Sequence, residues 1–379
     1  MNRERYSGGV RAVVVAMAAA GVFSGVACGQ AFYLTGLAPG TEGGRTYGLS
    51  ADGTIAAGWS SRANFTPGYV WTADTGRYDF GLEPGLPSLT ITAGLSGDGR
   101  AVVGTAGDLN QRRAFRWSGP GTYQTLGSFG YPATYAQAVN HDGSIIVGRG
   151  EFGTGGFIGQ AFRWTSATGM VGLGFTRPGH GFSEAAAISR DGSTIVGTSR
   201  GGSDYRAFTW TQGTGMLELP GLPGTTNVAL GVSADGAYVV GASGDGFLPV
   251  VWQAGQLRQL ELSGPYFTGA ANCVNDAGDV IGGYVAGPPG QTQYAAVWTP
   301  EWGMELLSDY LAFHGVQVPA GLTLTTCSAI SADGMTFAGW TERPNGGLEG
   351  YVAVIPCPAS VALLFPLLLS SLNRRRIAP

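Results

Sequence analysis

Aspartate is the residue type whose recurrence in this chain most invites a chemical explanation. An Asp-Gly pair returns at fairly regular intervals, for example at Asp52-Gly53 and Asp191-Gly192. Calcium loops need several oxygen ligands at alternating positions, whereas each of these segments offers a single carboxylate followed by glycine. Asp-Gly between apolar runs is also a strong hairpin signal, because glycine accepts the positive φ of a tight turn. We interpret the aspartates as turn residues and predict no metal site and no cofactor.

Other residues suited to catalysis are sparse. The three histidines, His141, His180 and His314, form no His-x-x-His pattern, and no paired-cysteine motif supports zinc. We expect no Gly-x-Ser-x-Gly nucleophile on a strand-to-helix turn. Spacing alone leaves open a catalytic set drawn from several repeats. The sequence predicts a non-enzymatic protein, with a carbohydrate-active enzyme, a hydrolase or lyase, as the alternative.

Tryptophan could bind sugars by stacking, but most tryptophans follow a regular phrase such as Phe162-Arg163-Trp164. In a strand, residues two apart share one face of the sheet, so this spacing predicts core packing. Trp59 and Trp302 lie outside that register and are the candidates for exposed contact.

An internal repeat organises most of the chain. Phrases of the type Leu49-Ser50-Ala51-Asp52-Gly53 occur seven times. Their closing glycines are separated by about 47 residues on average, the spacing of propeller repeats. The glycines are Gly53, Gly99, Gly143, Gly192, Gly236, Gly278 and Gly334.

Each repeat reads as four short strands: one before the Asp-Gly turn, one after it, one with the tryptophan phrase, and one with a leucine-glycine phrase such as Leu217–Gly224. Small sheets that cannot bury both faces alone do so by radial stacking. We predict an all-β fold, a seven-bladed β-propeller over residues 32–354 whose last blade is completed by the N-terminal strand near Phe32–Leu37. An open β-solenoid is the alternative. The apolar spacing in Met304–Leu311 predicts one or two helical turns.

This architecture sets a criterion for function. A cluster of exposed carboxylates and aromatic side chains around one end of the channel would favour the enzyme. An uncharged, glycine-lined channel would favour a binding or structural protein.

Composition narrows the choice of partner. Charged residues make up 12% of the 379 residues, the net charge is −4, and all 21 basic residues are arginine. Without a basic stripe, nucleic acid is not an expected partner. The 66 glycines fit many tight turns, because a hydrophobic fraction of 44% argues against disorder.

The N-terminus has the layout of a signal peptide, which we assign to residues 1–31. Arg3, Arg5 and Arg11 precede a short apolar segment, Val13–Val26, and small residues precede cleavage after Ala31. Cys28 is either a lipidation site or an ordinary residue of the discarded peptide. In an oxidising compartment Cys273 and Cys327 could form a disulfide, although free buried cysteines are the preferred interpretation.

Residues 355–379 form a short tail in three parts. Pro356, Pro358, Ala359 and Ser360 precede the apolar segment Val361–Leu372, which is followed by Arg374, Arg375 and Arg376. The layout resembles the PEP-CTERM sorting signal of Gram-negative bacteria, with Cys357 in place of the usual glutamate. The repeats resemble the extracellular HAF-type repeats that often accompany such tails.

The resemblance implies export across the inner membrane to the cell surface or extracellular matrix, and processing by an exosortase-type protease. It also implies an association with exopolysaccharide or another surface protein, and no defined activity. The apolar segment is too short and too rich in proline for a stable spanning helix, so we expect transient membrane insertion of the tail. A permanent anchor is the alternative.

Overall fold

The computed structural model describes residues 32–356, apart from residues 63–64, 84–86, 88, 109–110, 153–157 and 289–291. The predicted signal peptide, Cys28, and the tail from Cys357 onward, including Pro358, Ala359, Ser360, Arg374, Arg375 and Arg376, lie outside the described residues. Pro356, the last described residue, is exposed. Within the described range, no helix has the length and apolarity needed to cross a membrane.

Strands that are consecutive in sequence pair into small antiparallel sets. The first sets are β2 (Gly43–Leu49), β3 (Ile55–Ser61), β4 (Gly68–Thr72) and β5 (Gly76–Tyr78); then β6 (Leu89–Leu95), β7 (Val102–Gly107), β8 (Arg112–Trp117) and β9 (Gln124–Thr125). The next are β10 (Ala133–Val139), β11 (Ile145–Glu151), β12 (Gly159–Thr165) and β13 (Gly169–Gly174); then β14 (Phe182–Ile188), β15 (Ile195–Gly201), β16 (Asp204–Thr211) and β17 (Gly215–Glu218).

The remaining sets follow the same order. They are β18 (Asn227–Val232), β19 (Tyr238–Ser243), β20 (Leu248–Gln253) and β21 (Gln256–Gln259); then β22 (Thr268–Val274), β23 (Ile281–Ala286), β24 (Gln293–Thr299) and β25 (Gly303–Leu306). The last set comprises β26 (Thr323–Ile330), β27 (Thr336–Glu342), β28 (Leu348–Val354) and the N-terminal strand β1 (Phe32–Leu34). A single parallel pair, Gly159 with Phe182, joins β12 to β14 and merges two sets into one eight-stranded sheet.

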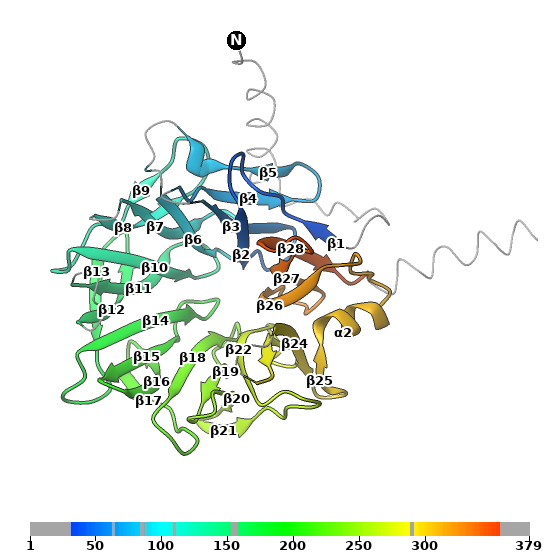
Figure 1. Cartoon of the computed structure of the whole chain (residues 1–379). Coiled ribbons are helices and arrows are strands. Elements are labelled where there is room, and N and C mark those ends of the chain that lie inside the picture. The colour runs from blue at the N-terminus through cyan, green and yellow to red at the C-terminus, as the bar shows by residue number, and fades with distance from the viewer. Residues whose placement is uncertain are drawn as a thin grey trace, which may run out of the picture.

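The sets stand around a central axis with their first strands innermost (Figure 1). These strands pack against one another in the order β2, β6, β10, β14, β18, β22 and β26, and β26 packs against β2 in turn. Radial stacking buries both faces of each set. The chain is therefore an all-β protein with a β-propeller fold, as the sequence predicted.

The repeated Ser-x-Asp-Gly phrase forms a hydrogen-bonded turn between the first and second strands. In the turn at Ser189, the serine hydroxyl donates to Asp191 Oδ1 over 2.8 Å and accepts the backbone N–H of Thr194 over 3.0 Å. Asp191 Oδ1 also accepts the N–H of Ser193 at 2.9 Å, and Gly192 has φ +77°. The carboxylate thus binds donors of its own turn, which confirms its predicted role.

Backbone hydrogen bonds also connect neighbouring turns. His141 N–H donates to Arg190 O over 3.1 Å, and Arg190 N–H donates to Ala234 O over 3.0 Å. Between the last and first turns, Ala332 N–H donates to Ala51 O over 2.8 Å. The Asp-Gly end of the ring is therefore linked across sets as well as within them.

A bulge interrupts most innermost strands at the same place. The pairing of β10 with β11 skips a residue between Ala136 and Ala138, and that of β14 with β15 skips one between Ala185 and Ala187. Opposite the first bulge, a Cβ on Gly148 would collide with the Tyr135 carbonyl oxygen. The close approach of the two backbones at the bulge therefore requires glycine at this position of β11.

The tryptophan phrase packs largely as expected. Trp71, Trp117, Trp164, Trp252 and Trp298 are buried, and Trp210 is half-buried. The leucine phrase differs from the prediction. In several sets the fourth strand ends before or within that phrase. The next apolar side chain is then buried against the following set, as are Phe80 after β5, Leu126 after β9 and Leu260 after β21.

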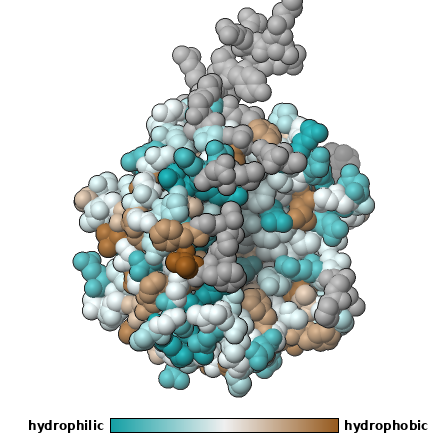
Figure 2. All heavy atoms as spheres, turned by 60° about the vertical axis from the view of Figure 1, so that its left-hand side comes forward, coloured by the Kyte–Doolittle hydropathy of each residue, from teal (hydrophilic) through white to brown (hydrophobic). Residues whose placement is uncertain are grey.

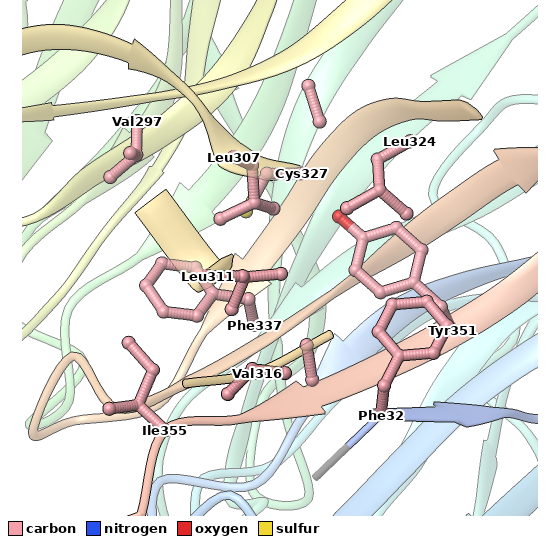
Figure 3. Close-up of a cluster of buried hydrophobic side chains, with 12 residues drawn as sticks. Phe32, Val297, Leu307, Leu311, Val316, Leu324, Cys327, Phe337, Tyr351 and Ile355 are labelled. Carbon is pink, nitrogen blue, oxygen red and sulfur yellow. The ribbon is translucent and has the colours of Figure 1, made fainter. Parts of the chain in front are cut away.

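Helix α2 (Leu307–Phe313) lies in the region where helical turns were predicted, although Gly303–Leu306 belongs to β25. Leu307 and Leu311 enter a buried cluster with Phe337, Tyr351 and Phe32 (Figure 3). Helix α2 therefore covers one side of the last set.

Exposed apolar side chains such as Val171 and Leu217 are scattered over the outer strands. On the face shown in Figure 2, hydrophobic residues form small patches separated by polar ones. Scattered residues of this kind are normal for a folded surface.

Candidate active site

Charged side chains gather at the end of the channel opposite the Asp-Gly turns, where β10 and β11 meet β14. Arg149 Nη1 lies 2.5 Å from Glu184 Oε1, and Arg149 Nε lies 3.1 Å from Glu151 Oε2. Gln137, the residue left unpaired by the β10 bulge, donates through Nε2 to Glu184 Oε1 over 2.6 Å. Two carboxylates from neighbouring sets thus share one guanidinium.

Burial and charge set the protonation of this cluster. Burial by itself lowers the pKa of Arg149, but the carboxylates of Glu184 and Glu151 more than offset it, so that its pKa is raised. The guanidinium therefore stays charged and pairs with both carboxylates. Glu184 remains 28% exposed. In the described part of the chain no hydrogen-bond donor contacts its second oxygen, Oε2, which is available to accept a proton.

Tyr135 supplies a neutral donor beside the carboxylates. Burial raises the pKa of its phenol, and hydrogen bonding to Glu151 raises it further. Arg149 Cζ lies 4.3 Å from the centre of the tyrosine ring, a cation–π contact that fixes the two side chains together. The hydroxyl therefore keeps its proton at neutral pH.

A pocket of about 470 Å³ opens next to this cluster, within the size range of small-molecule sites. Arg200 lines it: its Cζ lies 4.5 Å from the Phe182 ring centre, and its Nη1 donates to Tyr205 Oη over 2.8 Å. Val228, Leu230 and Phe247 complete the apolar part of the wall. Phe247 adopts φ +51°, a strained backbone for a bulky residue, and such strain concentrates at ligand sites.

A second polar constellation includes a serine, a histidine and an aspartate. Ser199, within the string Gly197-Thr198-Ser199-Arg200-Gly201, has its Oγ 2.9 Å from His180 Nδ1, and His180 Nε2 lies 3.5 Å from Asp204 Oδ2. However, Ser199 is fully buried and accepts the N–H of Thr176 over 3.2 Å.

Ser243 in β19 and Ser60 in β3 occupy the equivalent position and likewise accept loop N–H groups, from Leu222 and Ala38. The string lies inside β15, not on a turn into a helix. In these three sets the serine therefore secures the loop that precedes the innermost strand, β2, β14 or β18.

The predicted contact residues have different surroundings. Trp59 is half-buried at the channel mouth and stacks on Tyr47, with 6.2 Å between ring centres. Trp302 packs edge-on against Phe313 beside helix α2, with 4.1 Å between ring centres. His141 lies in an Asp-Gly turn and His314 follows α2. Among the described residues, no group of three or more His, Cys, Asp or Glu side chains gathers as metal ligands do.

The residues of the charged cluster were not among the predicted site residues. An alignment of the repeats with one another nevertheless shows the positions at which they lie. In the segment just before the turn phrase, one position is Tyr47, Ala93, Gln137, Ala186, Leu230, Asn272 and Ser328. The position two residues earlier is Arg45, Ile91, Tyr135, Glu184, Val228, Ala270 and Thr326. These two positions vary from repeat to repeat while their neighbours are small. Together they show where each innermost strand presents side chains to the channel mouth.

Solved structures share this fold. Oligogalacturonate lyase from Vibrio parahaemolyticus aligns with a TM-score of 0.57 at 12% identity, over 86% of this chain and 93% of that one. Puromycin hydrolase aligns at 0.55 and 15% identity, over 86% of this chain and 56% of that one. The β-propeller domain of the Trilobed protease from Pyrococcus furiosus aligns at 0.55 and 8% identity, over 83% and 94%.

The chain spans half the length of TolB from Acinetobacter baumannii, which aligns over 54% of this chain at 20% identity with a TM-score of only 0.40. No family model matches the sequence, and no curated protein matches it. At these identities the similarity establishes the β-propeller fold and nothing finer.

These findings contradict the prediction of a non-enzymatic protein. The structures that share the fold include a lyase and a hydrolase. The channel mouth also brings Glu184, Glu151 and Tyr135 together, although Glu151 is buried and the other two are half-buried, so the cluster is less exposed than the criterion for an enzyme requires. A single repeat shows no such cluster in its sequence, because the cluster combines side chains of adjacent sets.

Proposed function

We propose that the protein is a carbohydrate-active enzyme, a lyase that cleaves a uronic-acid-containing polysaccharide or oligosaccharide at the channel mouth. The observation that carries this proposal is the sharing of Arg149 by Glu151 and Glu184 beside Tyr135 and a pocket lined by Arg200. The fold similarity to an oligogalacturonate lyase supports the same substrate class.

Elimination from a uronate needs three groups: a cation for the carboxylate, a base for the adjacent carbon, and an acid for the leaving oxygen. In the proposed reaction Arg200 binds the uronate carboxylate and stabilises the negative charge that develops beside it. Glu184 Oε2 removes the proton from the carbon next to the carboxylate. The electron pair of that C–H bond forms the new C=C double bond, and the glycosidic C–O bond breaks.

Tyr135 then donates its proton to the leaving oxygen. One proton thus passes from the substrate to Glu184 and one from Tyr135 to the substrate, and no water is consumed. Both glutamates pair with the same guanidinium, whereas hydrolysis by a glutamate pair needs two carboxyl groups in separate roles on either side of the bond, so the arrangement favours elimination. Gln137 and Arg149 hold Glu184 in place.

The test is turnover of uronate polymers by the purified chain, followed by the ultraviolet absorbance of the unsaturated product. Glu184→Gln is expected to lower kcat by a factor of about 100 or more, the usual effect of losing a general base. Glu218→Gln is the matched control, because Glu218 lies on the edge strand β17 and pairs with Arg177. Absence of turnover on every uronate polymer, or unchanged turnover in Glu184→Gln, would contradict the proposal.

We also propose that the ring consists of seven blades and that the N-terminal strand closes it. The pairing of Phe32, Tyr33 and Leu34 with Ala353, Val352 and Tyr351 supports the closure. Deletion of residues 32–40 is then expected to destabilise the last set strongly, as a lower melting temperature would show.

Export and sorting complete the proposal. The layout of residues 1–31 and 355–379 supports signal-peptide cleavage and exosortase-type processing, which would place the enzyme at the cell surface or in the extracellular matrix, near exopolysaccharide. Mass spectrometry of the mature protein tests it: an intact C-terminal peptide ending at Pro379 would contradict processing.

A further inference from the structure

Aromatic side chains and an arginine gather where the first set meets the last. The guanidinium carbon of Arg45 lies 5.5 Å from the ring centre of Trp59 and 5.3 Å from that of Trp340. Tyr47 stacks on Trp59 with an interplanar angle of 13° and tilts against Trp340 with 5.2 Å between ring centres. All four side chains are half-buried.

Arg45 differs from Arg149 and Arg77 in its hydrogen bonding. Arg149 pairs with two carboxylates, and Arg77 pairs with Asp79 at 2.7 Å. No carboxylate or other acceptor of the described residues contacts the guanidinium of Arg45, which carries five N–H donors. A charged fork held between two indoles without an anion is suited to accept a carboxylate from outside.

Space for a ligand lies beside this group. A pocket of about 360 Å³ is lined by Arg45, Trp59, Gly43 and Gly44, among others. Gly43 leaves its part of the pocket wall without a side chain, where only Ser61 and the backbone of Leu348 lie near. A pyranose ring could therefore stack on Trp59 while its carboxylate meets Arg45.

The group lies at the same end of the ring as Glu184. Arg45 is the third residue of β2 and Glu184 the third of β14, and both strands run toward their Asp-Gly turns. In Figure 1, β2 and β14 lie on different sides of the central opening. In the ring, β2 contacts β6 and β26, whereas β14 contacts β10 and β18.

We propose that Arg45, Tyr47, Trp59 and Trp340 form a second subsite that binds a uronate residue of the same oligosaccharide across the channel mouth from Glu184. The proposal rests on the proposed function and names its substrate-binding determinant. Arg45 supplies the charge selectivity, and the indoles supply the stacking surface. Substrates long enough to reach both sites are then favoured over short ones.

The test is equilibrium binding of tetragalacturonate to the full chain by isothermal titration calorimetry, in the Glu184→Gln background to prevent turnover. Arg45→Gln is expected to weaken binding roughly tenfold or more, the effect of losing a charge-assisted hydrogen bond. Arg62→Gln is the control, because Arg62 lines the same pocket but is exposed and pairs with Glu42. Neutral cellotetraose is expected to bind more weakly than tetragalacturonate.

Equal losses in the two arginine variants, no loss in Arg45→Gln, or equal binding of cellotetraose would overturn the subsite. Quenching of indole fluorescence by tetragalacturonate, reduced in Trp59→Phe, gives a second measurement should Arg45→Gln fold poorly. If tetragalacturonate binds through Arg45 but is never cleaved by the unmodified protein, the proposed reaction is wrong and the subsite stands. If it is cleaved while Arg45→Gln binds normally, the subsite is wrong and the reaction stands.

Discussion

The rings of Phe32 and Tyr351 stack with 5.7 Å between their centres and 14° between their planes, although the two residues lie near opposite ends of the described chain. Phe32 is 2% exposed, and Tyr351 is fully buried. Their contact joins the N-terminal strand to the last set and to the side chains around helix α2.

We expect Phe32→Ala to lower the free energy of unfolding by about 3 kcal/mol, because truncating a buried phenylalanine loses apolar burial and leaves a cavity. Leu34→Ala in the same strand is the control, since Leu34 is 38% exposed and should cost far less. Urea denaturation of the two variants measures the difference. Equal losses would mean that β1 contributes by its backbone pairing alone.

The turn aspartates predict a pH dependence of stability. Hydrogen bonds from the Ser193 backbone and the Ser189 hydroxyl lower the pKa of Asp191, and similar turn hydrogen bonds lower the pKa of Asp142 and Asp235. A carboxylate with a lowered folded-state pKa stabilises the fold above its unfolded pKa, and this contribution is lost as pH falls through the folded value.

Acidification from about pH 5 to about pH 2 should therefore destabilise the unmodified protein more than the triple variant Asp142→Asn, Asp191→Asn, Asp235→Asn. Asparagine keeps an acceptor oxygen but not the charge, so the triple variant should be less stable than the unmodified protein near neutral pH, and the two stabilities should converge as the pH falls. Melting temperatures across this pH range test the expectation, which fails if both lose stability in parallel.

Cys273 Sγ lies 3.8 Å from Cys327 Sγ between β22 and β26, and both sulfurs pack against the space that Gly282 leaves. Burial raises the pKa of the Cys273 thiol well above its usual value. Because the thiolate is the reactive form, we expect iodoacetamide to leave both residues unmodified in the folded protein and to modify both after denaturation. Peptide mass spectrometry reads the result; protection that persists in denaturant until a reductant is added would instead reveal a disulfide.

Ser199→Ala separates a structural role from a catalytic one. Loss of the hydroxyl removes the acceptor for the Thr176 N–H and a partner of His180, so stability should fall by about 1 kcal/mol. Turnover should remain unchanged, because the buried serine does not reach the pocket. Loss of turnover without loss of stability would instead identify Ser199 as a nucleophile.

The sequence predicted those parts of the fold that local chemistry determines. Asp191-Gly192 indicated a turn because only a few residue types accept its backbone conformation, and Trp164 indicated a buried face through its spacing from Phe162. The leucine phrase was less informative. Phe80 and Leu126 are buried because of the following set, and burial across sets leaves no periodic signal within one repeat.

The candidate site was not predicted for a related reason. Glu184 is an isolated acidic residue in its own repeat and meets Arg149 only because the ring places β14 beside β11. The variable positions that contain Gln137 and Glu184 are visible once the repeats are superimposed. Their meaning required knowing which end of each strand faces the channel mouth.

The hydrogen bonds that join His141 to Arg190 and Ala332 to Ala51 link neighbouring sets at one rim of the ring. The opposite rim carries Glu184, Arg45 and the longer connections, and its side chains differ from one set to the next. The turns that link the sets and the proposed chemistry thus lie at different rims. A different binding specificity could therefore arise by exchanging a few side chains at the rim of Glu184 and Arg45, such as those at the positions of Tyr47 and Gln137. The hydrogen-bonded turns at the other rim would still hold neighbouring sets together.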